Sequence, residues 1–284
     1  MIGGPKQANA APAPPPEPPA QSAGAAGGRA LWLALTAEAQ GAAAREPLLG
    51  PLVDARVLRH ADLGGALASL LPRVLGPGLL PRDAVEDLVG EAVAAEPAVL
   101  GLVASDLAAA EARDPAAAGP LLPFLSYKGF HALALHRVAH ALWRRERREV
   151  ARLVQGEAAR ALAVDIHPAV PVGRGVFVDH GTGLVVGETA TVGNDVSILQ
   201  GVTLGGTGKE RGDRHPKVGD GVLLGAGAKV LGRVAVGRCA KVGAGSVVLR
   251  DVPPCATVAG VPARIVGWCW DAVPALAMEH GLPS

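Results

Sequence analysis

Three histidines stand between residues 163 and 267, and carboxylates lie close to them in the sequence. His167 follows Asp165 by two positions, His180 follows Asp179 directly, and the third is His215. Histidine is the natural general base near neutral pH, because its ordinary pKa is about 6.5. A carboxylate can fix the tautomer of such a base and stabilise its charged ring. A pair of this kind can take the proton from an alcohol, which is a poor nucleophile until a base does so.

Several other classes of function are disfavoured. A zinc site made of these histidines would need two of them close together, and their separations are 180 − 167 = 13 and 215 − 180 = 35 residues. The cysteines Cys239, Cys255 and Cys269 form neither a metal-binding pair nor a disulfide framework, so a reducing compartment fits best. The balance of 27 basic and 26 acidic side chains does not indicate a nucleic-acid binder. No run approaches the roughly 20 apolar residues of a membrane span.

An aliphatic residue recurs every six positions through the region that holds the histidines. The thirteen positions form three runs, separated by a two-residue slip and an eight-residue insertion: Ile166, Val172, Val178, Leu184; Val192, Ile198, Leu204; Val218, Leu224, Val230, Val236, Val242, Val248. This period matches neither a helix nor a simple strand, and it predicts a solenoid with three hexads in each coil. The aliphatic residues point inward, and small residues turn the corners. A coil then takes about 18 residues, so Asp165 and His180 can meet near one corner of neighbouring coils.

The rest of the chain divides by composition, with 38 glycines and 24 prolines but only 3% aromatic residues overall. An Ala- and Pro-rich opening has no hydrophobic period and predicts a disordered tail. Ala, Leu, Arg and Glu then dominate, which predicts helices. The predicted organisation is α+β: a tail at 1–28, a helical domain at 29–162, a β-helix at 163–267 and a C-terminal tail at 268–284.

Within the helical domain, Leu31 and Leu35 begin an apolar helix face. Ser105 or Asp106 is expected to cap a helix start. Asp114 precedes a proline, and proline disfavours helix at the residue before it, so we expect a helix to end there.

Longer motifs carry a resemblance to a known family. They are YKGFHALALHRVAH (127–140), VDIHPAVPVGRGVFVDHGTGLVVGETA (164–190), VSILQGVTLGGTGK (196–209), GDRHPKVGDGVLLGAGAKVLG (212–232) and VGAGSVV (242–248). These motifs resemble the serine O-acetyltransferases among the hexapeptide-repeat acyltransferases, over about residues 30 to 267. The resemblance implies a left-handed parallel β-helix. Sequence periodicity alone does not give this hand, since parallel crossovers are generally right-handed.

The resemblance also implies roles in moving an acetyl group from acetyl-CoA to the hydroxyl of L-serine. His180 matches the general base, and Asp165 matches the residue that orients it. Asp179 and Asp114 would receive the ammonium group of serine. His167 has no role in this scheme and is interpreted as structural.

The insertion between two hexad runs would supply the positive side of the serine site. Arg214 and His215 would bind the serine carboxylate there, because the planar guanidinium of arginine suits a carboxylate. Backbone N–H groups of the Gly-rich coils are the expected donors to the oxygen that becomes negative during transfer.

The motifs imply a groove for CoA as well. Its matched residues are Gly206, Ala226, Gly227, Lys241 and Arg264. Acetyl-CoA carries its own activated acyl group, so we expect a co-substrate with no permanently bound cofactor and no metal.

The family resemblance implies partners and regulation. It implies a homotrimer, or a dimer of trimers joined through the helical regions, with each active site between two subunits. It also implies feedback inhibition by L-cysteine at the serine subsite. Members of the family typically end in isoleucine, which enters the active site of O-acetylserine sulfhydrylase. This sequence ends HGLPS, so we expect weak or absent binding to that enzyme.

Alternative functions stay open at this point. They are a hexapeptide-repeat acetyltransferase with a sugar or antibiotic acceptor, and a catalytically inactive scaffold solenoid. Location is open too: the cytoplasm, or a plastid or mitochondrion if the opening segment is a transit peptide, although that segment holds no arginine.

Overall fold

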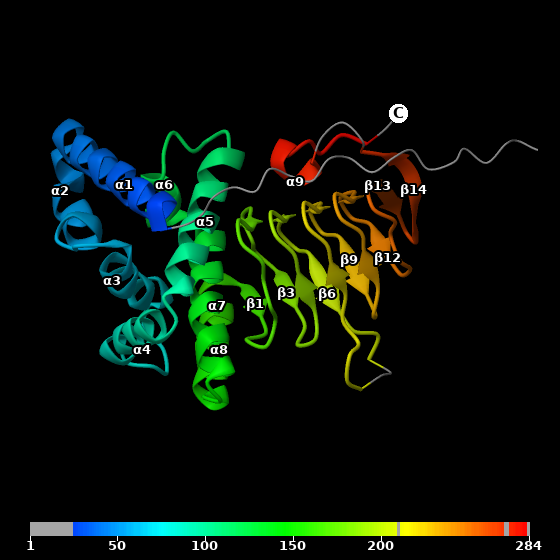
Figure 1. Ribbon diagram of the computed structural model, residues 1–284, viewed down its shortest axis with the longest axis horizontal. Helices are drawn as coiled ribbons and strands as arrows, with labels where there is room; N and C mark the ends of the chain where they lie inside the picture. The colour runs from blue at the N-terminus through cyan, green and yellow to red at the C-terminus, as the bar shows by residue number, and fades with distance from the viewer. Residues whose placement is uncertain (1–24, 209–210, 270–272, 283–284) are drawn as a thin grey trace, which may run out of the picture.

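The computed structural model describes residues 25–208, 211–269 and 273–282. Helices come first along the chain and a ladder of short strands follows, as Figure 1 shows from blue to red. The helices and helical turns are α1 (Ala25–Arg45), η1 (Pro47–Leu49), α2 (Gly50–Val53), η2 (Asp54–Leu58), α3 (Leu63–Leu75), α4 (Arg82–Ala95), α5 (Ala98–Arg113), α6 (Leu121–Ser126), α7 (Lys128–Arg144), α8 (Arg148–Leu162) and α9 (Pro274–Ala277).

The helix boundaries can be compared with the expected ones. Helix α1 begins at Ala25, so it covers the end of the segment predicted as a tail at 1–28, and the remainder lies outside the described residues. Leu31 and Leu35 are buried, as their spacing predicted. Helix α5 ends at Arg113, just before Asp114, as predicted. No single described helix is long and apolar enough to cross a membrane, and only α4 with α5 has that length and composition together, across a 106° bend.

The strands build three sheets along a parallel solenoid. They are β1 (Val164–Ile166), β2 (Phe177–Val178), β3 (Leu184–Val186), β4 (Thr191–Val192), β5 (Ser197–Ile198), β6 (Thr203–Gly205), β7 (Lys217–Val218), β8 (Leu223–Leu224), β9 (Lys229–Leu231), β10 (Ala235–Val236), β11 (Lys241–Val242), β12 (Val247–Val248), β13 (Ala256–Gly260) and β14 (Ala263–Trp268). We name each sheet after its first strand. The β1-sheet has the order β1-β3-β6-β9-β12, the β2-sheet β2-β5-β8-β11-β13-β14, and the β4-sheet β4-β7-β10.

Neighbouring strands in each sheet pair in parallel, and the single antiparallel pair among the described strands is β13 with β14. The predicted inward positions are buried, except that Val172 is half-buried and packs against the core. The predicted fold class is therefore confirmed: a helical domain followed by a β-helix of hexapeptide repeats.

One corner of the solenoid, which we call the left-handed corner, lies one or two residues before each of the five parallel strands of the β2-sheet, β2, β5, β8, β11 and β13. Five residues occupy it in successive coils, all with positive φ: Gly175 (63°), Asp195 (53°), Gly221 (67°), Cys239 (54°) and Cys255 (60°). Glycine adopts this conformation at no steric cost, whereas other residues adopt it rarely. The fold therefore requires a sharp turn in every coil, and glycine occupies the turn in two of the five coils.

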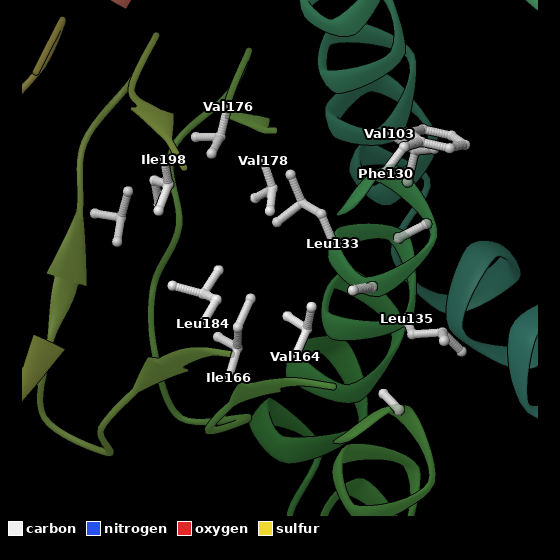
Figure 2. Close-up of a cluster of buried hydrophobic side chains, with 14 of the residues drawn as sticks. Val103, Phe130, Leu133, Leu135, Val164, Ile166, Val176, Val178, Leu184 and Ile198 are labelled. Atoms are coloured by element: carbon white, nitrogen blue, oxygen red, sulfur yellow. The ribbon is translucent and has the colours of Figure 1, made fainter. Parts of the chain in front are cut away.

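Apolar side chains join the helices to the first coils. Figure 2 shows Phe130 and Leu133 of α7 on one side and Val164, Val178 and the neighbouring inward residues of the solenoid on the other. All are at most 9% exposed, so this boundary is a continuous part of the core rather than a contact between separate domains.

Buried ion pairs reinforce the same boundary. Asp106 of α5 accepts hydrogen bonds from Arg137 of α7 (Nε to Oδ2, 3.0 Å) and from the backbone N–H of Val176 (2.9 Å). Arg137 also donates to the carbonyls of Val172 and Gly173. Burial raises the pKa of Asp106 to about 6, against the opposing charge of Arg137.

The expectation that Ser105 or Asp106 caps a helix is wrong. Both lie within α5, which starts at Ala98 after Pro97. Ser105 Oγ accepts a hydrogen bond from the N–H of Gly175, 3.1 Å away. The two polar side chains face the solenoid and satisfy backbone N–H groups that its first corner leaves without a strand partner.

The C-terminal segment returns along the β2-sheet, with α9 beside the solenoid in Figure 1. Ser197 Oγ donates to the carbonyl of Ala275 (2.7 Å), and Lys241 Nζ donates to the carbonyl of Gly281. Met278 packs against the cluster of Ala109, Ala110 and Phe177, so the returning segment reaches the junction of helices and solenoid.

Candidate active site

An acidic cluster surrounds His180 where the helices meet the first coil. Asp114 directly follows α5, and Tyr127 stands directly before α7. Asp179 and His180 follow β2, and the Asp179 carboxylate (Oδ1) lies 3.7 Å from His180 Nε2. His180 is 74% exposed at its side chain, and its own φ is 55°. A tight turn therefore presents the imidazole to solvent beside the Asp179 carboxylate, which in turn lies near that of Asp114.

The close approach of α7 explains how this turn is held. Gly129, in the first turn of α7, lies against the Val178 carbonyl, and any Cβ at this position would collide with it. Lys128 Nζ also donates to Thr182 Oγ1 in the same turn. The glycine lets the start of α7 lie directly on the turn that carries His180.

The cluster raises the pKa of two of its members, Asp179 and Tyr127. Burial raises the pKa of Asp179, and the nearby negative charge of Asp114 raises it further, while His180 opposes both. Burial raises the pKa of Tyr127 to about 12, together with its hydrogen bond to Asp114 and the charge of Asp179. Tyr127 is therefore a neutral hydrogen-bond donor, and a cation placed between the two carboxylates would be stabilised.

Asp165 lies apart from His180. Its side chain projects from β1, and its Oδ1 accepts a hydrogen bond from Gln155 Nε2 of α8 at 2.6 Å. Among the described side chains, no hydrogen bond or ion pair joins Asp165 to His180. The carboxylate that pairs with His180 is that of Asp179. The role expected for Asp165 stays a prediction.

Arg214 and His215 lie together between β6 and β7. The Thr189 backbone N–H donates to His215 Nδ1 (3.2 Å), which leaves the ring proton of neutral His215 on Nε2. Thr189 Oγ1 accepts from the backbone N–H groups of both Arg214 (3.1 Å) and His215 (3.2 Å). Burial and the charge of Arg214 lower the pKa of His215, while Glu188 opposes this shift. The pair can present a guanidinium and a neutral N–H to an anion.

The two halves of the predicted serine site occupy different corners. His180 lies between β2 and β3, where the chain passes from the β2-sheet to the β1-sheet. Arg214 lies between β6 and β7, where it passes from the β1-sheet to the β4-sheet, on an insertion that projects from the solenoid in Figure 1. One chain therefore carries the predicted ammonium-binding half and the predicted carboxylate-binding half at opposite ends of the strands of the β1-sheet.

The residues expected to bind CoA are also spread out. Ala226 and Gly227 lie between β8 and β9, at the same type of corner as His180. A Cβ on Gly206 would lie 3.3 Å from Arg214 Cγ, so this residue belongs with the other corner. Lys241 is buried under the C-terminal segment, and Arg264 is exposed on β14.

Sequence reasoning missed three residues of these clusters: Tyr127, Gln155 and Thr189. Tyr127 is the first residue of the motif at 127–140, and Thr189 lies in the motif at 164–190. Both motifs carry the family resemblance, which could have directed attention to these two residues. His167 fits its structural interpretation, since its Nδ1 accepts from Ala169 N–H (3.1 Å) and its ring packs edge-on against Trp143.

Comparisons with known proteins show which family the chain resembles. The family model described as "Serine acetyltransferase, N-terminal" matches residues 31–134, and that of the bacterial transferase hexapeptide repeats matches residues 215–250. Serine acetyltransferase of Salmonella typhimurium is 49% identical over 250 residues, covering 88% of this chain and 92% of the relative.

Solved structures show the same similarity. Serine acetyltransferase from Vibrio cholerae is 49% identical with a TM-score of 0.87, covering 89% of this chain and 98% of its own. A serine acetyltransferase in complex with cysteine is 47% identical with a TM-score of 0.87 over 89% of this chain and 99% of its own. The Brucella abortus enzyme in complex with coenzyme A is 45% identical with a TM-score of 0.82 over 84% of this chain and 96% of its own.

Identity at this level extends over the helices and the solenoid alike, and it accounts for the fold. The chain belongs to the serine acetyltransferase family.

Proposed function

We propose that the chain transfers the acetyl group of acetyl-CoA to the hydroxyl of L-serine, with His180 as the general base. The observation that carries this proposal is the exposed imidazole of His180 beside the acidic cluster of Asp114, Tyr127 and Asp179. A cationic amino group held by the carboxylates would place a nearby hydroxyl within reach of the ring. Support also comes from the solved relative that contains coenzyme A.

The proton movements follow from this arrangement. Neutral His180 takes the proton of the serine hydroxyl as the oxygen attacks the thioester carbonyl. The ring then carries a positive charge, which the Asp179 carboxylate 3.7 Å away stabilises. His180 returns the proton to the departing thiolate of CoA, so the base is restored. Asp165 is proposed to orient the ring, with its own carboxylate held by Gln155.

The charge that forms on the carbonyl oxygen needs donors. Backbone N–H groups of the glycine-rich corners are proposed for this task, because they are fixed before the reaction begins. Gly206, Ala226, Gly227, Lys241 and Arg264 are proposed to contact CoA, and for Lys241 this requires the C-terminal segment to move away from its amino group.

A complete site needs two copies of the chain. Arg214 and His215 lie at the opposite end of the β1-sheet strands from His180, so a second copy must bring them to the serine carboxylate. We propose a ring of three copies, since closed cyclic assemblies provide such repeated interfaces. A pair of rings joined through the helical regions is the larger form of this proposal.

A mixing experiment tests this arrangement. His180→Ala and Arg214→Ala are each expected to be almost inactive alone. Trimers formed by co-expressing equal amounts should regain about a quarter of the wild-type turnover, because about one interface in four then joins two intact halves. Absence of recovery in mixed oligomers of verified composition would place both halves in one chain.

The reaction itself is checked by thiol release from acetyl-CoA with and without L-serine. Release that needs L-serine supports the acceptor, whereas release with a sugar or antibiotic acceptor, or none at all, contradicts it. L-Cysteine is proposed to compete with L-serine through the same charged groups, consistent with the solved relative that contains cysteine.

Two expectations are retained as proposals. Binding to O-acetylserine sulfhydrylase is proposed to be weak or absent, and a titration of the two purified proteins that shows nanomolar affinity would contradict it. For location, a fluorescent fusion of residues 1–40 distinguishes a cytoplasmic protein from an organellar one.

A further inference from the structure

The three cysteines of the chain meet at the far end of the solenoid, away from the acidic cluster. The backbone N–H of Cys255 donates to the carbonyl of Arg238 (2.8 Å), which places Cys255 directly over Cys239 in the next coil. The N–H of Cys269 donates to the carbonyl of Cys255 (2.7 Å), which places Cys269 beside it after β14. Residues far apart in sequence thus form one cluster of thiols.

Two of these cysteines occupy the left-handed corner. Cys239 and Cys255 have φ values of 54° and 60° at positions where Gly175 and Gly221 stand in other coils. Cysteine adopts this conformation rarely, and strained positions of this type point to a use for the side chain. The corner would turn equally well with glycine, so the sulfur atoms are the feature that the two cysteines add.

The stacking suits a disulfide between Cys239 and Cys255. Their strands pair in register, with Lys241 opposite Thr257. Neighbouring parallel strands lie about 4.8 Å apart, within the range of Cα separations found in disulfides. The thiols already interact with each other side chain to side chain.

Cys269 differs from the other two in access. Cys239 and Cys255 are fully buried, and burial raises the pKa of both thiols. Cys269 is half-buried, and its Sγ lies 3.0 Å from Thr257 Oγ1, a hydroxyl that can donate to a thiolate. An oxidant from solution therefore reaches Cys269 first.

We propose that Cys269, Cys255 and Cys239 form a peroxide-responsive thiol site whose final product is the Cys239–Cys255 disulfide. The Cys269 thiolate attacks hydrogen peroxide and becomes a sulfenic acid, releasing one water after protonation. The Cys255 sulfur displaces the hydroxyl as a second water and forms a Cys255–Cys269 disulfide. Cys239 then attacks Cys255, which restores the thiol of Cys269. Overall, two thiols lose two hydrogens and one peroxide becomes two waters.

Peptide mapping tests the proposal cleanly, because trypsin places each cysteine in a separate peptide. These are 239–241, 251–264 and the peptide that begins at Ile265. The full chain is treated with hydrogen peroxide, its remaining thiols are alkylated, and it is digested without reduction. We expect the first two peptides to be linked, Cys269 to be alkylated, and dithiothreitol to reverse the link.

Two variants separate the steps. Cys239→Gly suits the corner, as Gly221 does, and it should stop the reaction at a Cys255–Cys269 link. Cys269→Ser should slow the Cys239–Cys255 link by about tenfold or more, because both remaining thiols are buried.

Three results contradict the proposal. One is a wild-type chain whose three thiols are all alkylated after peroxide treatment. Another is a Cys269→Ser variant that forms the link at the wild-type rate. The third is a link between Cys269 residues of two copies in place of the link within one chain.

Discussion

Arg113, the last residue of α5, forms an ion pair with Asp195 in the solenoid, with Nη2 3.3 Å from Oδ1. Arg113 also donates to Ser197 Oγ at 3.1 Å. Both charged side chains are nearly buried, so the pair fixes the end of α5 on the solenoid. Asp114 follows directly, which means that the ion pair determines where the acidic cluster stands relative to His180.

Arg113→Met should therefore disturb stability and substrate binding together. Removing one partner leaves Asp195 as an uncompensated buried charge, which costs about 3–5 kcal/mol of unfolding free energy. We expect the KM for L-serine to rise as Asp114 shifts. Denaturant unfolding and steady-state kinetics measure the two effects. The double variant Arg113→Met/Asp195→Asn is the control, since it leaves no unpaired charge and should regain part of the lost stability.

His180→Ala should lower kcat by about 100-fold or more, the usual scale for a general base. The KM for L-serine should change little, because the ammonium and carboxylate contacts come from other side chains. Initial rates over a range of L-serine concentrations provide the measurement. A variant with near-normal kcat would remove His180 from the role of base.

Asp114→Asn should raise the KM for L-serine roughly tenfold, because a charge-assisted hydrogen bond to the ammonium becomes a neutral one. The KM for acetyl-CoA should stay unchanged. The matched control is Asp54→Asn, an exposed carboxylate that pairs with Arg59 in the helical part. A fall in kcat with an unchanged KM for L-serine would argue against ammonium binding by Asp114.

Stability should decline when the pH falls below about 6.5, partly through His136. Burial holds the pKa of His136 well below its ordinary value, and Arg137 adds to the shift. Below about pH 6.5, His136 binds a proton in the unfolded chain but stays neutral in the folded chain. The stabilisation that is present above the unfolded pKa of His136 is therefore lost as the pH falls.

Thermal unfolding of the wild type and of His136→Gln from pH 8 to pH 5 measures this effect. Glutamine can keep the donor to the carbonyl of Val170, which His136 Nε2 contacts at 3.1 Å. The unfolding temperature of the variant should fall less than that of the wild type between pH 8 and pH 5. Equal slopes for the two proteins would show that His136 does not contribute.

The solenoid could be predicted because its signal is local. Each hexad places an aliphatic residue at the same inward position, and the thirteen repeats can be seen without knowing any contact between distant residues. The end of α5 at Arg113 was predictable for the same reason, since Asp114 stands before a proline. Such patterns depend only on residues that are close in sequence, so they can be recognised without knowing the folded structure.

Contacts across long separations could not be predicted. Ser105 and Asp106 are residue types that commonly cap helices. They instead accept hydrogen bonds from the backbone N–H groups of Gly175 and Val176, about seventy residues later. Likewise nothing in the spacing of Gln155 and Asp165 indicates that an amide of α8 holds that carboxylate. Such pairings depend on how α5 and α8 lie on the first coils, and that placement is decided by the buried apolar boundary as a whole.

The apolar boundary of α7 with the first coil has a consequence for self-association. A stack of parallel strands can in principle be extended at either end by another chain. Helices α7 and α8 occupy one end, and at the other the antiparallel strand β14 ends the β2-sheet. Deleting the helices would uncover a row of unpaired backbone groups beside a strip of valine and isoleucine, and the remaining solenoid should associate with other chains through that uncovered end.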